Sequence, residues 1–185
     1  MAIKATVYKA AVQLADMDRA VYADHAITLA REPSETDERL MARILAFALN
    51  VPANDDQGGL LFARGIADAD EPDLWQHDLS GVLMQWIEVG QPDERRLAKA
   101  CGRARRVVIY VYSSAAAIWW AAIAGKAARL RNMQVWQIPA EQSQALAKMA
   151  ARSMQLQVTV QDGQVWVGNG SSSVELAPQR LHPAA

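Results

Sequence analysis

A charge-free run of nineteen residues from Val107 to Gly125 constrains the fold more than any other part of this sequence. It begins with VVIYVY, which is β-branched and aromatic, and becomes rich in alanine after Ser113 and Ser114. A membrane span needs about 20 apolar residues, but the change of character at the two serines favours a buried strand followed by a helix. A strand this apolar is typical of the centre of an α/β sheet, covered on both faces. No membrane association is expected.

The segments on either side of this run add further strands and helices. An N-terminal β-hairpin is expected over residues 8–29, because apolar residues alternate on both sides of a turn at 16–19. A helix follows Pro33, with Ser34 and Asp37 at capping-box spacing. Strands are expected at residues 73–77, 82–89, 107–112, 133–139, 155–161, 164–168 and 172–176, and further helices from Pro92 to Gly102, at 114–130 and at 140–152. Asp162-Gly163 and Asn169-Gly170 are strong hairpin signals.

The order of these elements predicts a single α/β domain over residues 1–185. Its mixed central sheet is flanked by helices and extended by N- and C-terminal β-hairpins, and residues 178–185 are expected to be a frayed tail. Cys101 is the only cysteine, so no intrachain disulfide can form and a reducing, cytoplasmic location is expected. The net charge of −1 does not indicate a nucleic-acid partner, which would need a local basic patch. The scattered histidines exclude a conventional zinc motif.

The stretch from Asp78 to Ala100 carries the candidate chemistry. Asp78 lies ten residues before Glu88, which is near the end of an apolar strand, and a helix rich in arginine and lysine follows. Carboxylates are the ligands that Mg²⁺ prefers, and cations attract phosphate. Asp78 and Glu88 are therefore candidates for a Mg²⁺ or Mn²⁺ site that acts on a phosphodiester.

Several motifs resemble those of the YaeQ family of small bacterial proteins. They are ET-x-ER at residues 35–39, DLSG at 78–81, WIEVGQP at 86–92, the KA at Lys99 and the VVIYVY strand. The resemblance covers essentially the whole chain. It implies a variant of the PD-(D/E)xK nuclease fold, with the restriction-endonuclease-like core α-β-β-β-α-β that the element order also predicts. It implies no activity, because members of the family lack a well-established one.

Carried over residue by residue, the nuclease pattern assigns three acids to a metal. Glu38 matches the acid of the first core helix, Asp78 matches the aspartate of the PD motif, and Glu88 matches the acid of (D/E)xK. A literal Pro-Asp pair at Pro72-Asp73 competes with Asp78 for its role.

The lysine of the pattern is missing, since Gly90 stands two residues after Glu88. In a strand, residues two apart point to the same face, which is how that lysine reaches the same phosphate as the acid. Lys99 on the next helix and Gln91 are the candidate replacements, the first for the phosphate and the second for a water. Asp78, Glu88, Gln91 and Lys99 form the candidate catalytic set.

Each assignment has a structural alternative. Glu88 could pair with Arg95 or Arg96, Asp78 could be an ordinary turn residue, and Glu38 could answer the dipole of its helix. The cations at 95, 96, 99 and 103 recur on one helical face, which suits either a phosphate backbone or solvent with ion pairs to Asp93 and Glu94. Neighbouring Trp119 and Trp120 diverge by about 100° on a helix, so one could be exposed to a partner, although core packing of both is the default.

Two functions remain open. The first is a metal-dependent nuclease-like protein that acts on phosphodiesters through clustered carboxylates. The second is a catalytically inactive nuclease-fold protein that binds nucleic acid or a protein partner in a regulatory role, motivated by Gly90 and the near-zero net charge. A purely structural role rests only on the paired tryptophans.

Overall fold

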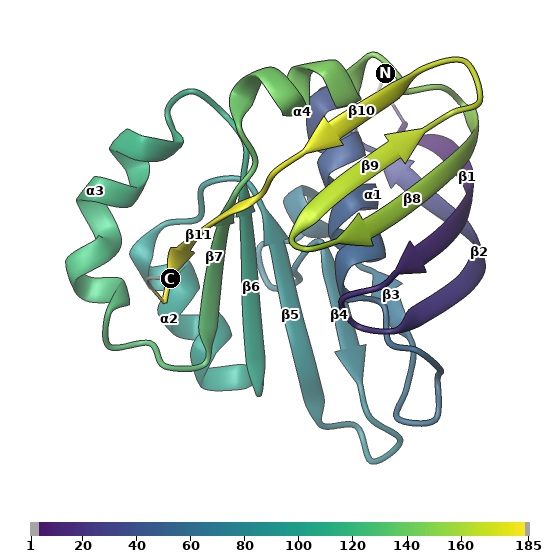
Figure 1. Ribbon diagram of the computed structural model, residues 1–185. Coiled ribbons are helices and arrows are strands. Elements are labelled where there is room, and N and C mark those ends of the chain that lie inside the picture. Colours follow the sequence, from purple (N-terminus) through teal and green to yellow (C-terminus); the bar gives the residue numbers. More distant parts are fainter. Residues whose placement is uncertain (1–3, 184–185) are drawn as a thin grey trace. The chain divides into compact units, whose positions relative to one another are not determined.

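The computed structural model describes residues 4–183, whose contacts divide into two compact units. Unit 1 contains the chain up to Ala53 together with Glu141–Pro178, and unit 2 contains Asn54–Ala140 with the residues from Gln179 onward. The mixed α/β class is confirmed, but each unit has its own mixed sheet in place of the one central sheet expected (Figure 1). The expectation of one domain over residues 1–185 stays a prediction.

The sheet of unit 1 joins the N-terminal hairpin to the C-terminal meander. Its strands run in the order β10-β9-β8-β1-β2, and only the pairing of β1 with β8 is parallel. The bounds are β1 (Thr6–Asp16), β2 (Val21–Arg31), β8 (Ser153–Gln161), β9 (Gln164–Gly168) and β10 (Ser173–Leu176). Both terminal hairpin regions are therefore as the sequence predicts. Alternate residues of these strands are buried, which leaves the opposite face of the sheet polar.

Helix α1 (Asp37–Asn50) covers the inner face of this sheet. Met41 and Ile44 of α1 enclose a small apolar space together with Leu156 of β8, Val167 of β9 and Leu146 of α4 (Ala140–Ala147). The cap of α1 is Thr36, whose hydroxyl accepts a hydrogen bond from the Arg39 backbone N–H, and not Ser34 as the capping-box spacing suggested. The helix begins two residues later than expected because Glu32–Glu35 form a turn of their own.

The sheet of unit 2 has the order β11-β7-β6-β5-β4-β3. Its strands are β3 (Leu60–Phe62), β4 (Leu74–His77), β5 (Leu83–Val89), β6 (Arg106–Val111), β7 (Met133–Gln137) and β11 (Gln179–His182). A short 3₁₀ helix, η1 (Gly65–Ala67), lies between β3 and β4. Strands β5, β6 and β7 are parallel, and the apolar strand β6 lies at the centre of the sheet, as expected.

Helices α2 (Glu94–Arg103) and α3 (Ala116–Ala127) cover one face of this sheet (Figure 1). Trp119 and Trp120 of α3 both pack against the resulting core, so neither is a free aromatic anchor. Helix α2 is capped by Asp93 and includes Gly102, whereas the sequence placed its first residue at Pro92 and its end before Gly102. No helix of residues 4–183 has the length and apolar character required to cross a membrane.

The C-terminal segment differs most from expectation. Residues 179–182 form β11, which pairs antiparallel with β7, where a frayed tail over 178–185 was expected. The segment QRLH has no alternating pattern, and the edge of β7 supplies the hydrogen bonds that order it. Residues 184–185 lie outside the described part of the chain.

Candidate functional site

Glu88 lies near the end of β5 and is almost fully buried, with 6 % of its surface exposed. Its Oε1 accepts a hydrogen bond from the Trp86 indole N–H at 2.7 Å. The Arg96 Nε of α2 lies 2.6 Å from Oε1 and 2.8 Å from Oε2. A buried carboxylate is stable only when it is paired and hydrogen-bonded, and Arg96 and Trp86 meet that requirement.

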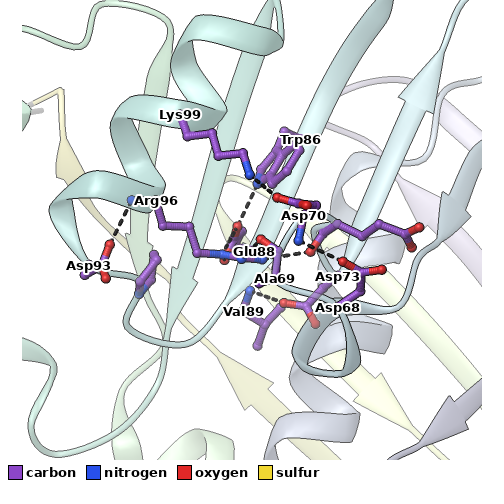
Figure 2. Close-up of polar contacts among 12 residues, drawn as sticks. Asp68, Ala69, Asp70, Asp73, Trp86, Glu88, Val89, Asp93, Arg96 and Lys99 are labelled. Carbon is purple, nitrogen blue, oxygen red and sulfur yellow. Dashed lines mark hydrogen bonds and ion pairs between the residues drawn. The ribbon is translucent and has the colours of Figure 1, made fainter.

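Arg96 also holds the loop between η1 and β4. Its two terminal nitrogens donate to the carbonyl oxygens of Ala69 at 2.6 Å and Glu71 at 2.7 Å. Figure 2 shows the guanidinium extending from α2 to Glu88, with Ala69 beside it. One side chain therefore connects a helix, a strand and a loop, because the guanidinium directs its several N–H donors at three different groups.

Asp73 is the acid that lies opposite Glu88 across the β4–β5 pair. Its backbone N–H bonds the Ile87 carbonyl at 3.1 Å, and its Oδ2 accepts from the Val89 N–H at 2.8 Å. It is as buried as Glu88, and its Oδ1 lies so close to Gly65 that a Cβ added there would be 2.4 Å away. Of the two competing aspartates, Asp73 is thus the one that the fold brings to the same strand end as Glu88.

Burial raises the pKa of Glu88, and the negative charge of Asp73 adds to this effect. The hydrogen bonds and charge of Arg96 act in the opposite direction, as does the Trp86 indole. Arg96 is thus the main group that favours the ionised form of Glu88 against the effect of burial.

Asp78 lies in the turn between β4 and β5 and does not approach Glu88. Its Oδ1 accepts bonds from the Ser80 N–H and hydroxyl and from the Val82 N–H, and the Ser80 hydroxyl is the largest cause of the lowered pKa of Asp78. The five residue-to-residue steps from Leu83 to Glu88 put roughly 17 Å of strand between the turn and Glu88. Asp78 and Glu88 do not converge as expected. Asp78 lies at the turn of the β4–β5 hairpin and Glu88 at its open end, so the length of the hairpin separates them.

Glu38 belongs to unit 1, where the Ser143 hydroxyl of α4 donates to its Oε1 at 2.5 Å. Its neighbour Glu35 is buried and pairs with Arg39 at 2.8 Å and Arg43 at 3.1 Å. Each polar residue of the ET-x-ER motif therefore has a structural role in unit 1: Thr36 caps the helix, Glu35 pairs with Arg39, and Glu38 bonds Ser143. The sequence did not indicate the buried pair, because Arg43 falls on the apolar side of α1.

Neither candidate for the missing lysine reaches Glu88 in this arrangement. Lys99 pairs with Asp70 of the η1–β4 loop, and the Gln91 amide donates to the Ser113 hydroxyl at 2.5 Å. The N–H of Gly90 still bonds the Tyr110 carbonyl at 2.8 Å, as the β5–β6 pairing requires, but its φ of +124° lies outside the strand region, so the strand ends there. A side chain at position 90 would therefore not follow Glu88 on the strand face as the nuclease pattern requires.

Three of the four cations on the basic face of α2 are engaged with their own unit, and Arg95 is exposed. Arg96 contacts Glu88, Lys99 contacts Asp70, and Arg103 donates to the Asp70 carbonyl at 3.2 Å and lies over the Trp86 ring. This arrangement matches the alternative in which the cations form ion pairs, although their acidic partners are Glu88 and Asp70 rather than Asp93.

A divalent metal does not fit Glu88 as it is held here. Both carboxylate oxygens are within hydrogen-bond distance of Arg96 Nε, so a metal ion at Glu88 would have to displace a paired guanidinium. Within residues 4–183, no three side chains of histidine, cysteine, aspartate or glutamate form a group that could hold a metal ion. Glu38, Asp78 and Glu88, the expected ligands, each have a local partner instead.

Comparison with known proteins identifies the family. The family model described as YaeQ protein matches residues 1–178. This chain belongs to the YaeQ family. It is 44 % identical over 178 residues to the uncharacterised YaeQ protein of Salmonella typhi and 43 % identical to that of Escherichia coli K12, and each alignment covers 95 % of both chains.

Two solved YaeQ structures have the same fold as this chain. The crystal structure from Xanthomonas axonopodis pv. citri has a TM-score of 0.89 and 44 % identity, and covers 98 % of this chain and 99 % of that one. The structure from Pseudomonas syringae has a TM-score of 0.88 and 36 % identity, with 96 % of each chain covered. The YaeQ resemblance of the sequence motifs is confirmed.

Proposed function

We propose that this protein is a nuclease-fold member of the YaeQ family that acts by binding a partner and not by cleaving phosphodiesters. The observation that carries the proposal is the ion pair of Arg96 with both oxygens of Glu88. In the PD-(D/E)xK pattern this acid binds a metal ion, whereas here it anchors an arginine that also holds the Ala69 and Glu71 carbonyls. Gly90 adds support, since no side chain follows Glu88 to a phosphate.

A protein partner is favoured over nucleic acid. Nucleic-acid binding requires cations that are available to neutralise phosphates, but three cations of α2 are engaged within unit 2 and the net charge is −1. Unit 2 instead exposes large apolar side chains. Leu79 and Val82 of the β4–β5 turn are 83 % and 38 % exposed, and Leu61 of the edge strand β3 is 62 % exposed. Contiguous exposed apolar patches are typical of contact sites for proteins, and these three side chains are the candidates for such a patch on unit 2.

The test combines metal titration with cleavage assays. Mn²⁺ is titrated calorimetrically into the wild type, Glu88→Gln and the control Glu94→Gln, whose carboxylate contacts Lys126 at 2.5 Å on α3. Single- and double-stranded DNA and RNA are then incubated with each protein and Mg²⁺ or Mn²⁺. We expect that none of the proteins cleaves any of these substrates. We also expect Glu88→Gln and the wild type to give the same Mn²⁺ titration. Cleavage that Glu88→Gln abolishes and Glu94→Gln retains would refute the proposal.

Metal-dependent cleavage through Asp73 and Glu88 is the second candidate function. It is favoured by the position of Asp73 opposite Glu88, where the two charges interact. In this case Arg96 would have to leave the Glu88 carboxylate before a metal ion could bind there. Mn²⁺ binding that appears in Arg96→Gln and disappears in the double variant with Asp73→Asn would support this candidate.

A further inference from the structure

The outward face of the unit 1 sheet carries an open hollow of about 450 Å³, far along the sequence from the acids described above. It is lined by Gln157 and Thr159 of β8, Trp166 and Gly168 of β9, and the serines at 171–173 in and after the β9–β10 loop. Its volume is within the range of small-molecule sites. Nothing in the proposed partner binding by unit 2 explains this surface.

The hollow exists because a glycine interrupts a row of outward-facing side chains. Gly168 lies in register between Gln157 of β8 and Ser173 of β10. Trp166 lies two residues earlier on the same face, directly opposite Thr159. Since Gly168 has no side chain, the space above it is left open, with the half-buried indole on one side and Gln157 on another.

The rim of the hollow is held in place by Asn169. Its Oδ1 accepts four hydrogen bonds, from the backbone N–H and hydroxyl of Ser171 at 3.1 and 3.0 Å and from those of Ser172 at 2.9 and 3.1 Å. These contacts fix the positions of both hydroxyl oxygens, whose lone pairs can accept hydrogen bonds from a ligand. Groups that are fixed before binding lose less entropy when a ligand arrives.

No charged side chain lines the hollow itself, and the exposed Glu175 of β10 lies opposite Trp166 on the same face. The polar groups of the lining are one carboxamide and several hydroxyls, which can both donate and accept hydrogen bonds. The Gln157 side-chain amide donates a hydrogen bond to the Gln13 Oε1 of β1 at 3.4 Å, which places a second carboxamide beside the lining. A phosphate or a nucleic-acid backbone would require lysine or arginine here. The chemistry suits a ligand that is uncharged, rich in hydroxyl groups and apolar on one flat side.

We propose that this hollow binds a neutral sugar residue of a glycan. The C–H face of a pyranose ring would pack on the Trp166 indole, and its hydroxyls would bond Gln157, Thr159 and the loop serines. Aromatic rings contribute a large, rigid contact area for such packing. The site is non-catalytic, because no acid or base lines it.

The experiment uses the full chain and a defined set of probes. Glucose, galactose, N-acetylglucosamine and their linear tetrasaccharides are tested by saturation-transfer NMR, and affinities are measured by titration. Trp166→Ala removes the indole on which the sugar ring would pack. Gly168→Val fills the hollow, and it should fold because a Cβ there meets only the Ser172 carbonyl oxygen, at an ordinary 3.6 Å. Tyr22→Ala is the matched control, an aromatic residue on the outward side of β2 that is 65 % exposed and does not line the hollow.

We expect at least one probe to bind, and both hollow variants to weaken it by about tenfold or more while Tyr22→Ala leaves it unchanged. Far-UV circular dichroism checks that each variant is folded. If Gly168→Val does not fold, Gly168→Ala with Thr159→Val replaces it. The proposal is overturned if no probe binds, if binding survives Trp166→Ala, or if a single-stranded RNA oligomer binds in the hollow in preference to every sugar.

Discussion

The variant Arg96→Ala tests the central feature of unit 2, the bridge between α2, β5 and the η1–β4 loop. In the folded protein the Arg96 side chain is 24 % exposed and the Glu88 side chain 8 % exposed, so this is a largely buried pair. Removing one partner of a buried pair costs about 3–5 kcal/mol, because the other charge is left uncompensated. Water can replace Arg96 at the exposed Ala69 carbonyl, which places the expected loss near the lower limit, about 3 kcal/mol.

Urea unfolding followed by tryptophan fluorescence measures this loss, since Trp86 donates to the same carboxylate. With a slope of about 2 kcal/mol per molar urea, the midpoint should fall by about 1.5 M at neutral pH. The matched control is Arg95→Ala on the exposed side of the same helix, which changes helix propensity equally and should have little effect.

The loss of unfolding free energy in Arg96→Ala, relative to the wild type, should also depend on pH. Burial already raises the pKa of Glu88, and loss of the Arg96 charge raises it further. A carboxyl group whose folded pKa lies above its unfolded value makes the folded state less stable as pH rises through that folded pKa. The difference between wild type and variant should therefore be small below the ordinary glutamate value of 4.5 and grow toward neutral pH. Equal midpoints for Arg96→Ala and Arg95→Ala at neutral pH, or a deficit that does not change with pH, would refute this reasoning.

Two further predictions concern Gly90 and Cys101. Gly90→Lys restores the residue of the nuclease pattern but places a side chain at a φ of +124°, so it should cost about 1–3 kcal/mol in unfolding free energy and create no Mg²⁺-dependent cleavage. Cleavage by this variant, or unchanged stability in urea, would contradict the prediction. Burial raises the pKa of the Cys101 thiol from 9.0 to about 11, which lowers its thiolate population near neutral pH about 100-fold. Iodoacetamide should label Cys101 slowly in the folded chain and rapidly in urea, and equal rates would show that the thiol is not shielded.

Much of the fold could be predicted because its signals are local. The Asp162-Gly163 turn has positive φ angles of 53° and 76°, as its dipeptide requires, and the uninterrupted apolar pattern of residues 107–112 produced a central strand. Other elements depend on distant partners. Strand β11 forms only because the edge of β7 is available, and the separation into two sheets depends on the parallel pairing of β1 with β8. The sequence of a strand does not show which distant strand it will pair with, so neither pairing could be predicted.

The candidate site could be predicted only in part. The pairing of Glu88 with Arg96 was one of two alternatives, and helical spacing could not decide between Arg95 and Arg96. Asp73 could have been preferred over Asp78 from strand register, because residues flanking a hairpin on its open side face each other whereas a turn residue does not. The contribution of the Ala69 and Glu71 carbonyls was not accessible, since backbone groups carry no residue-type signal.

The parallel pairing of β1 with β8 has a consequence for how the chain folds during synthesis. Gln13 and Gln157, which meet across these strands, are 144 residues apart. A ribosome therefore releases the β1–β2 hairpin and α1 long before the strand that completes their sheet has been made. During that interval Met41 and Ile44 of α1 lack Leu156 and Val167 as packing partners. The early segments would then have to remain soluble through most of translation, a period in which chaperones bind exposed apolar surface.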